Sequence, residues 1–195
     1  TRTSSSAASD VYKRQRQSRP NPDGVWLRLF GELTQRPRRS IELREHPQPI
    51  VPMTCGILRP AVLVPEASRQ WDDSMKRSVL LHELAHVRRS DVAWLLVGRM
   101  ACTLFWFHPL AWFALRRLRH ESELACDDAV VQSGERATDY AEQLLNVARL
   151  CSSARGASLG AAMAEGSNLE HRVRSLFDSS RNHRPIRRSM LAGLM

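Results

Sequence analysis

Two histidines four residues apart, with a glutamate directly after the first, constrain this chain more than any other feature. They stand in LLHELAHVRRSD, residues 80–91. An α-helix turns about 100° per residue, so positions i and i+4 lie on one face, and a helix can offer both imidazoles to one metal ion. Polar residues at 72–74 can cap such a helix, which we expect to begin near Met75 and to end near Arg89.

His82, Glu83 and His86 suit a zinc site that carries its own base. Imidazole nitrogens are ordinary zinc ligands, and Glu83 lies one step round the helix, where its carboxylate can reach an activated water. The alternative is a solvated helix that happens to hold two histidines. Apolar residues on both sides of the motif predict a largely buried helix, in which polar side chains need partners. We therefore predict His82 and His86 as ligands of one zinc ion and Glu83 as a catalytic base.

A catalytic zinc ion needs a third protein ligand and an open position. In HESELACDD, residues 120–128, Glu121 and Glu123 are two positions apart and point in nearly opposite directions on a helix. Glu123 shares a face with Asp127, whereas Glu121 lines up with basic positions. The spacing favours Glu123 as the third ligand and leaves Glu121 as an ordinary solvated acid.

The segment before the motif predicts a small sheet. Three short strands, ended by prolines, are expected at about 40–45, 49–53 and 61–64. After the motif, the apolar run 92–115 is too short and too broken for a confident transmembrane span, and it suits a core helix or an interfacial helix. Pro109 should end one helix and open the next.

The rest of the chain predicts further helices. The helix after Pro109 should stop at Gly134, and residues 138–150 should form an amphipathic helix. Its apolar face consists of Tyr140, Leu144, Val147 and Cys151. Residues 152–168 are rich in Gly, Ser and Ala and are expected to be a flexible loop, followed by a short helix at 168–178.

The net charge limits the kinds of binding partner, and the cysteine content indicates the redox compartment. The 195 residues carry a formal charge of +9, which suits nucleic acid or an anionic membrane surface. The arginine-rich ends hold few aromatic residues, so we expect no direct contact with nucleic acid. The four cysteines form no CxxC pair, which argues against a disulfide framework or a cysteine zinc site and fits a reducing compartment.

Three blocks of sequence together resemble one family. LLHELAHVRRSD, FWFHPLAWFALRRLRHESELACDDAVV and YAEQLL are similar, in order and spacing, to the M56 family of membrane metallopeptidases. These are the zinc-protease domains of BlaR/MecR-type antibiotic-sensing signal transducers. The likeness covers about residues 40–150 and reaches at most to 178.

The resemblance implies a gluzincin fold with one Zn²⁺ ion held by His82, His86 and Glu123. Glu83 would be the catalytic base, and Asp127 would orient a ligand from behind it. The family also implies a bacterial inner-membrane location with the peptidase domain facing the cytoplasm, contact with membrane lipid, and a protein substrate. That substrate would be a transcriptional repressor or the chain itself.

The domain organisation that follows has four parts. We expect a non-native or disordered tail at 1–15, a basic membrane-proximal linker at 16–39, the M56-like zinc peptidase domain at 40–178, and a basic tail with the start of a truncated transmembrane helix at 179–195.

The expected fold is α+β, mostly helical with a small sheet, and partly membrane-associated. Two other functions stay open: a catalytically silent membrane-signalling scaffold that keeps the zincin fold, and a nucleic-acid-binding module that depends on the basic flanks. The residue that stabilises the oxyanion beside zinc is not fixed, and Tyr140, His108 and His120 are candidates.

Overall fold

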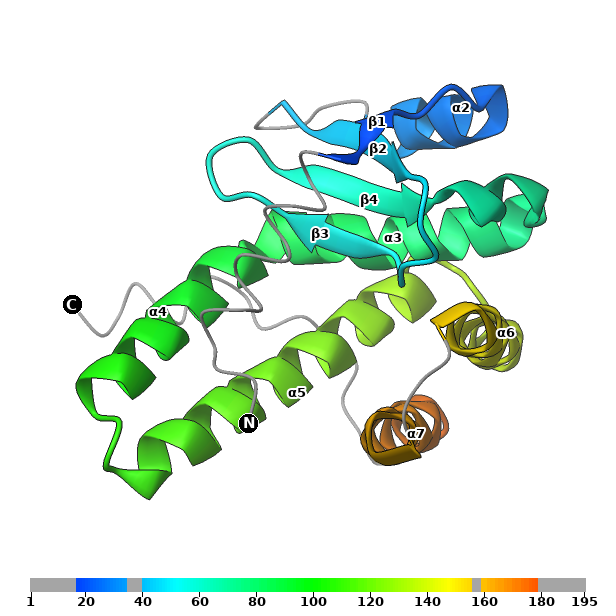
Figure 1. The fold of residues 1–195 in the computed structure, drawn as a ribbon. Coiled ribbons are helices and arrows are strands. Elements are labelled where there is room, and N and C mark those ends of the chain that lie inside the picture. Colours follow the sequence, from blue (N-terminus) through cyan, green and yellow to red (C-terminus); the bar gives the residue numbers. More distant parts are fainter. Residues whose placement is uncertain (1–16, 35–39, 156–158, 179–195) are drawn as a thin grey trace.

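A small mixed sheet lies on a set of helices in the computed structural model, which describes residues 17–34, 40–155 and 159–178, with the backbone alone for 151–167 (Figure 1). The elements are β1 (Arg19–Pro20), α2 (Gly24–Leu33), β2 (Glu42–His46), β3 (Met53–Cys55), β4 (Ala61–Pro65), the 3₁₀ helix η1 (Glu66–Gln70), α3 (Asp73–Arg89), α4 (Asp91–Leu104), α5 (Pro109–Gln132), α6 (Ala137–Arg155) and α7 (Leu159–Leu176). The expected α+β class, mostly helical with a small sheet, is confirmed.

The strand order in the sheet is β1-β2-β4-β3. β2 and β4 are parallel, whereas β1 and β3 pair antiparallel with their neighbours. All five residues of β4 are buried, which explains why this strand is a continuous apolar run rather than an alternating one. β3 is an edge strand, and it contacts the helix that carries the histidine motif.

The main core lies between one face of the sheet and the helices α2 and α3. It combines Trp26 and Leu29 of α2, Leu43, Val62 and Val64 of the sheet, and Leu80 and Leu84 of α3. Trp26 and Leu80 are both completely buried. This packing fixes the motif helix against the sheet.

The expected linker at 16–39 contains two elements of the fold, and this expectation was wrong. Asp23 caps α2 by accepting hydrogen bonds from the backbone N–H groups of Val25 and Trp26. β1 pairs with β2, and Arg19 forms an ion pair with the buried Glu45 at 3.1 Å. The arginine-rich composition of this segment suggested a linker, although residues 24–33 form an amphipathic helix with Asp23 as its N-cap.

The second strand lies further along the chain than the expected 49–53. It covers Met53–Cys55, because Pro49 and Pro52 lack the N–H group that pairing with β4 would need. Gly56 then turns the chain with a φ of 82°, and a Cβ atom there would collide with the carbonyl oxygen of Arg59. The prolines thus set the start of the strand and the glycine sets its end.

The motif helix agrees with the prediction at its C-terminal end and begins slightly earlier than expected. Asp72 caps it by accepting from the backbone N–H of Met75, and Ser90 ends it with a left-handed φ of 58°. α4 starts at once, and with α5 it forms an antiparallel hairpin that extends away from the sheet in Figure 1. Among the described residues, no helix is both long and apolar enough to span a membrane.

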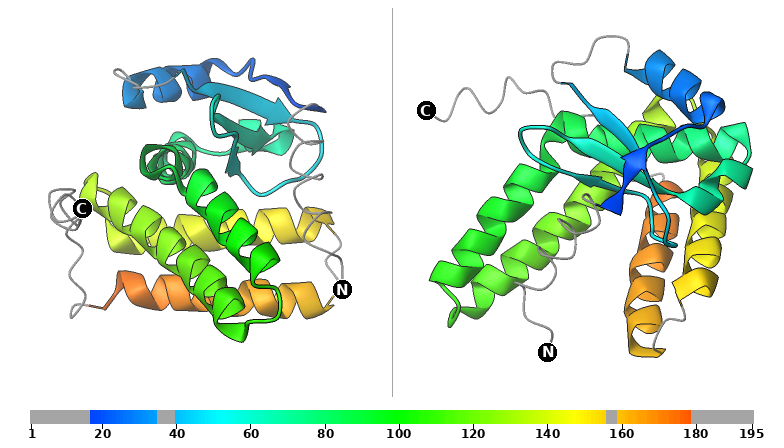
Figure 2. Two further views of the ribbon diagram at one scale, coloured as in Figure 1. Left: turned by 90° about the vertical axis from the view of Figure 1, so that its left-hand side faces the viewer. Right: turned by 45° about the horizontal axis from the view of Figure 1, so that its top comes forward.

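The loop expected at 152–168 was also wrong. α6 continues to Arg155 and α7 begins at Leu159; between them only 156–158 lie outside the described residues. Glycine and serine disfavour a helix by no more than about 1 kcal/mol each, and tertiary packing such as that of α7 on α5 and α6 overrides such preferences. α6 and α7 lie side by side in Figure 2, and with α3 and α5 they form a second core around Leu81, Val130 and Tyr140. The tails expected at 1–15 and 179–195 lie outside the described residues.

Candidate metal centre

His82 and His86 point from α3 toward a carboxylate on α5. The Nε2 atom of His82 lies 3.5 Å from Oε2 of Glu123, and the Nε2 atom of His86 lies 3.7 Å from Oε1 of the same carboxylate. One ligand atom from each of the three residues lies within 4.8 Å of the other two. Two imidazoles and a carboxylate are a zinc donor set that leaves a coordination position open, so these residues fit the metal.

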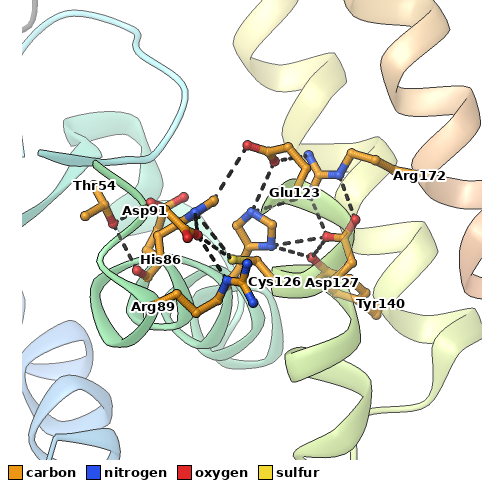
Figure 3. A network of polar contacts seen from close by, with 11 residues as sticks. Thr54, His86, Arg89, Asp91, Glu123, Cys126, Asp127, Tyr140 and Arg172 are labelled. Atoms are coloured by element: carbon orange, nitrogen blue, oxygen red, sulfur yellow. Dashed lines mark hydrogen bonds and ion pairs between the residues drawn. The ribbon is translucent and has the colours of Figure 1, made fainter. Parts of the chain in front are cut away.

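Each histidine uses its other nitrogen to contact an acid. Nδ1 of His82 lies 3.2 Å from Oδ1 of Asp127. Nδ1 of His86 lies 2.9 Å from Oδ2 of Asp91, and Figure 3 shows this second pair. A carboxylate on this side favours the tautomer with the proton on Nδ1 and leaves the lone pair of Nε2 free to bind a metal. Asp127 therefore lies where the sequence placed it, whereas the role of Asp91 was not predicted.

Tyr140 of α6 lies behind His82. Its hydroxyl donates to Oδ1 of Asp127 at 2.7 Å and is 3.0 Å from Nδ1 of His82. This is the side of the imidazole opposite Glu123. The geometry gives Tyr140 an orienting contact rather than the oxyanion contact considered from the sequence.

Arg172 of α7 joins the two acids of α5. Its Nε and Nη2 donate to the two oxygens of Asp127 at 2.8 and 2.6 Å, and its Nη1 lies 3.2 Å from Oε2 of Glu123. Its Nη2 also lies 3.5 Å from Nε2 of His82. Arg172 was not predicted from the sequence. It lies 49 positions after Glu123 in the chain, and only the packing of α7 on α5 brings the two residues together.

Burial and close charges shift the pKa values of these groups. Burial lowers the pKa of His82, but hydrogen bonds with Asp127 and Glu123 outweigh it and raise this pKa to about 9. Burial raises the pKa of Glu123, but His82 and Arg172 overcome that effect and lower the value to about 2. The pKa of Asp127 also falls, because its bonds with Arg172 and His82 outweigh the effect of burial. Both carboxylates are therefore ionised at neutral pH.

Glu83 is buried beside the two histidines, with 6% of its surface exposed. The hydroxyl of Thr54 on β3 lies 2.8 Å from Oε2 of Glu83 and 3.0 Å from its backbone oxygen. The edge strand thus fixes the side chain expected to act as base. Thr54 could not be chosen from the sequence, because its contact with Glu83 depends on how β3 packs against α3.

These side chains line a cavity of about 290 Å³. His82, Glu83, His86 and Glu123 share its wall with residues 51–54 at the sheet edge and with apolar residues of α4 and α6. The cavity therefore places a metal-binding group, a buried carboxylate and an edge strand around one space.

The other candidates lie away from this cavity. Glu121 forms an i,i+4 ion pair with Arg117 at 2.6 Å, and both side chains are exposed, as the helical spacing predicted. His108 is exposed at the start of α5. His120 packs edge-on against His171, with ring centroids 4.4 Å apart. Neither histidine lines the cavity, so the structure does not support an oxyanion role for them.

A second group of possible ligands uses the other nitrogen of His86. His86, Asp91 and Cys126 also bring one ligand atom each within 4.8 Å. Burial raises the pKa of the Cys126 thiol. His82, His86 and Glu123 all line the cavity, whereas Cys126 does not, so the first group is the one that a substrate in the cavity could reach.

Comparison with known proteins identifies the family of this chain. The family model described as BlaR1 peptidase M56 matches residues 4–176. The chain belongs to the M56 peptidase family, whose members are metallopeptidases, and this confirms the resemblance seen in the sequence. The match begins well before residue 40, as expected if β1 and α2 belong to the domain.

A curated relative is known as well. The chain is 31% identical to regulatory protein BlaR1 of Bacillus licheniformis over 125 residues. The alignment covers 62% of this chain and 20% of the relative, so the chain spans about a fifth of the length of that protein.

Proposed function

We propose that this chain is a zinc-dependent endopeptidase domain of the gluzincin type. His82, His86 and Glu123 would hold one Zn²⁺ ion. The observation that carries the proposal is the convergence of their ligand atoms within 4.8 Å, next to the buried carboxylate of Glu83. When bound, zinc would supply a Lewis acid that polarises a carbonyl and acidifies water.

The remaining steps belong to the side chains of the protein. Glu83 takes a proton from the attacking water and delivers it to the leaving nitrogen of the cleaved amide. Thr54 holds Glu83 toward the cavity from β3. Asp127 and Asp91 keep the Nε2 atoms of the two histidines directed at Glu123, and Arg172 fixes Asp127 through two hydrogen bonds.

A protein substrate suits the shape of the site. β3 is an edge strand whose residues Met53 and Thr54 line the cavity. An extended peptide can add to such an edge through backbone hydrogen bonds, which would bring a peptide bond beside Glu83. We propose that the substrate is a transcriptional repressor or the chain itself.

The likeness to BlaR1 supports a wider setting for this domain. We place it in a membrane-bound signal transducer of antibiotic resistance, in the bacterial inner membrane, with the peptidase facing the cytoplasm. A catalytically silent scaffold is the alternative. It would need no base in the cavity, and the contact between Thr54 and Glu83 favours the enzyme.

The test compares Glu83→Gln with Glu121→Gln in the full-length protein in native-like membranes. Zinc content is measured by mass spectrometry, and cleavage of casein and of the chain itself by the appearance of new amino termini. Glutamine keeps the shape of Glu83 without its basicity, so we expect one zinc ion and a loss of activity of about 100-fold or more. Glu121→Gln should match the wild type in both readings.

Two results would count against the enzyme. A Glu83→Gln variant with normal turnover would remove the proposed base. A wild-type protein that holds zinc and cleaves nothing under signalling conditions would support the silent scaffold.

A further inference from the structure

The α4–α5 hairpin exposes most of the large apolar side chains on the described surface. The described residues include 16 exposed large hydrophobic side chains, and 12 of these belong to the hairpin, from Trp94 to Leu118. Within the hairpin the most exposed side chains are Met100, Leu104, Trp106, Phe107, Leu110 and Phe113, each between 63% and 71%. They surround the turn between the two helices, at the end that extends away from the sheet in Figure 1. A soluble surface rarely gathers so many apolar residues unless something covers them.

The hairpin is already packed internally without these residues. Gly98 faces Leu115 so closely that a Cβ atom would lie 2.9 Å from the Leu115 Cδ1 atom. The thiol of Cys102 donates to the carbonyl of Ala111 at 3.2 Å. At the turn, Nε1 of Trp112 donates to the carbonyl of Trp106 at 2.9 Å. The indole N–H of Trp112 therefore has a hydrogen-bond partner within the turn, while the aromatic rings of the turn remain exposed.

The charged side chains of the hairpin are all positive between residues 92 and 120. Residues 92–120 contain no Asp or Glu, but they include Arg99 on α4 and Arg116, Arg117 and Arg119 on α5. Burial and the positive charge of Arg99 lower the pKa of Arg119. Neighbouring like charges at the base of an apolar tip favour an anionic partner. Lipid phosphates provide such charges directly above an apolar layer.

The spacing along α5 matches the layers of a membrane surface. From Pro109, Arg116 and Arg119 lie seven and ten residues on, or about 10–15 Å at the rise of an α-helix. Interfacial segments bury their apolar faces about 5–10 Å into the boundary between headgroups and acyl chains. An aromatic tip below a level of arginines fits that depth.

We propose that the α4–α5 hairpin is a wedge that inserts into one leaflet of an anionic phospholipid membrane. The aromatic tip enters the acyl boundary, and Arg99, Arg116 and Arg119 contact the phosphates.

A second consequence rests on the proposed peptidase function. Glu123 lies 14 residues from Pro109, or about 21 Å along the same helix, and therefore about 6–10 Å beyond the arginines. The substrates of the site are then segments that lie close to the membrane surface.

The five tryptophans allow a direct test. Trp94, Trp106 and Trp112 are exposed on the hairpin, whereas Trp26 and Trp71 are buried in the core. The 195-residue chain is mixed with vesicles of phosphatidylcholine and phosphatidylglycerol that carry brominated acyl chains, which quench nearby indoles. We expect quenching of the hairpin tryptophans and flotation of the chain with the vesicles. Neutral phosphatidylcholine vesicles should bind about tenfold or more weakly.

Three variants identify the contact. Trp106→Ser with Phe107→Ser should weaken vesicle binding at least tenfold, and Arg116→Gln with Arg119→Gln should remove most of the preference for anionic lipid. Leu58→Ser is the matched control, because Leu58 is 89% exposed outside the hairpin, and it should bind like the wild type. Circular dichroism checks that each variant folds.

Other results would overturn the wedge. Vesicle binding that the tip variant leaves unchanged would move the contact elsewhere. Absence of binding, with a concentration-dependent dimer that the tip variant abolishes, would assign the hairpin to a second copy of the chain. Glu83→Gln should bind vesicles like the wild type, so a failed peptidase assay and a failed membrane assay can be told apart.

Discussion

The two nitrogens of each motif histidine have different partners. Nε2 of His82 and of His86 faces Glu123, whereas the Nδ1 atoms face Asp127 and Asp91. Loss of Glu123 would remove a metal ligand. Loss of Asp127 would leave all three ligands in place and would remove only the contact that orients His82. Glu123, Asp127 and the exposed Glu121, all on α5, therefore differ in what they do for a metal.

Alanine substitutions at these acids should rank in one order. Glu123→Ala should lower zinc affinity by more than 100-fold, because two histidines alone remain. Asp127→Ala should lower it by about 10–100-fold, the usual effect of losing a partner behind a ligand. Glu121→Ala should change it little, since Glu121 pairs with exposed Arg117. Competition for zinc against a chelator measures all three, and release of zinc by Glu121→Ala alone would reverse the assignment.

The raised pKa of His82 predicts how zinc affinity depends on pH. Its value in the metal-free fold is about 9, above its ordinary 6.5, so protonated His82 stabilises that fold below about pH 6.5, and this contribution is lost as pH rises through 9. Zinc needs the neutral imidazole and must displace the proton. The apparent affinity should thus rise by up to about tenfold per pH unit from pH 7 and level off near 9.

The control for this pH dependence is Asp127→Asn, which removes a hydrogen bond that raises the pKa of His82. The plateau should then begin at a lower pH. The measurement is competitive binding at several pH values, corrected for protonation of the chelator. An affinity that stays flat between pH 7 and 9 in the wild type would show that zinc displaces no proton from His82.

At this scale, the sequence could predict the residues that depend on helical spacing. His82, Glu83 and His86 follow from five consecutive positions, and Glu123 with Asp127 follows from an i,i+4 pair. Thr54, Asp91 and Arg172 could not be found in this way. Their roles need β3, α4 and α7 to reach the centre, and no local pattern encodes such contacts.

Among the elements, those with clear end signals were predicted best. α3 has a capping Asp72, and α5 has Pro109 at its start and Gly134 just after its end. α2 was assigned to a linker and the first half of α7 to a loop, because arginines, glycines and serines dominated the composition of these stretches. The amphipathic pattern of α2 was present, but without the sheet nothing showed what its apolar face would cover.

Removing Trp26 tests whether α2 belongs to the fold. Trp26 is fully buried in the main core, and its neighbour Leu27 is 48% exposed. Trp26→Ala should lower the free energy of unfolding by about 3–5 kcal/mol, and Leu27→Ala by no more than about 0.5 kcal/mol. Urea unfolding followed by circular dichroism measures both. Equal, small effects would restore the view of residues 16–39 as a linker.

For the molecule as a whole, the candidate centre lies where separate parts of the chain meet. α3 gives the histidines, α5 the acids, α7 the arginine, and the sheet edge the contact to Glu83. The same fold brings Cys126 to the far side of His86, where its sulfur lies 3.3 Å from Nδ1. Two ligand sets that share His86 are therefore available, and they differ in whether sulfur is present.

X-ray absorption at the zinc edge distinguishes these two sets most directly. The measurement uses the chain loaded with one equivalent of zinc. A centre of His82, His86 and Glu123 predicts only nitrogen and oxygen ligands, at about 2.0–2.2 Å, with the scattering pattern of two imidazoles, and the same spectrum for Cys126→Ser. A sulfur ligand at about 2.3 Å that disappears in Cys126→Ser would place zinc on the other side of His86 and contradict the proposed active site.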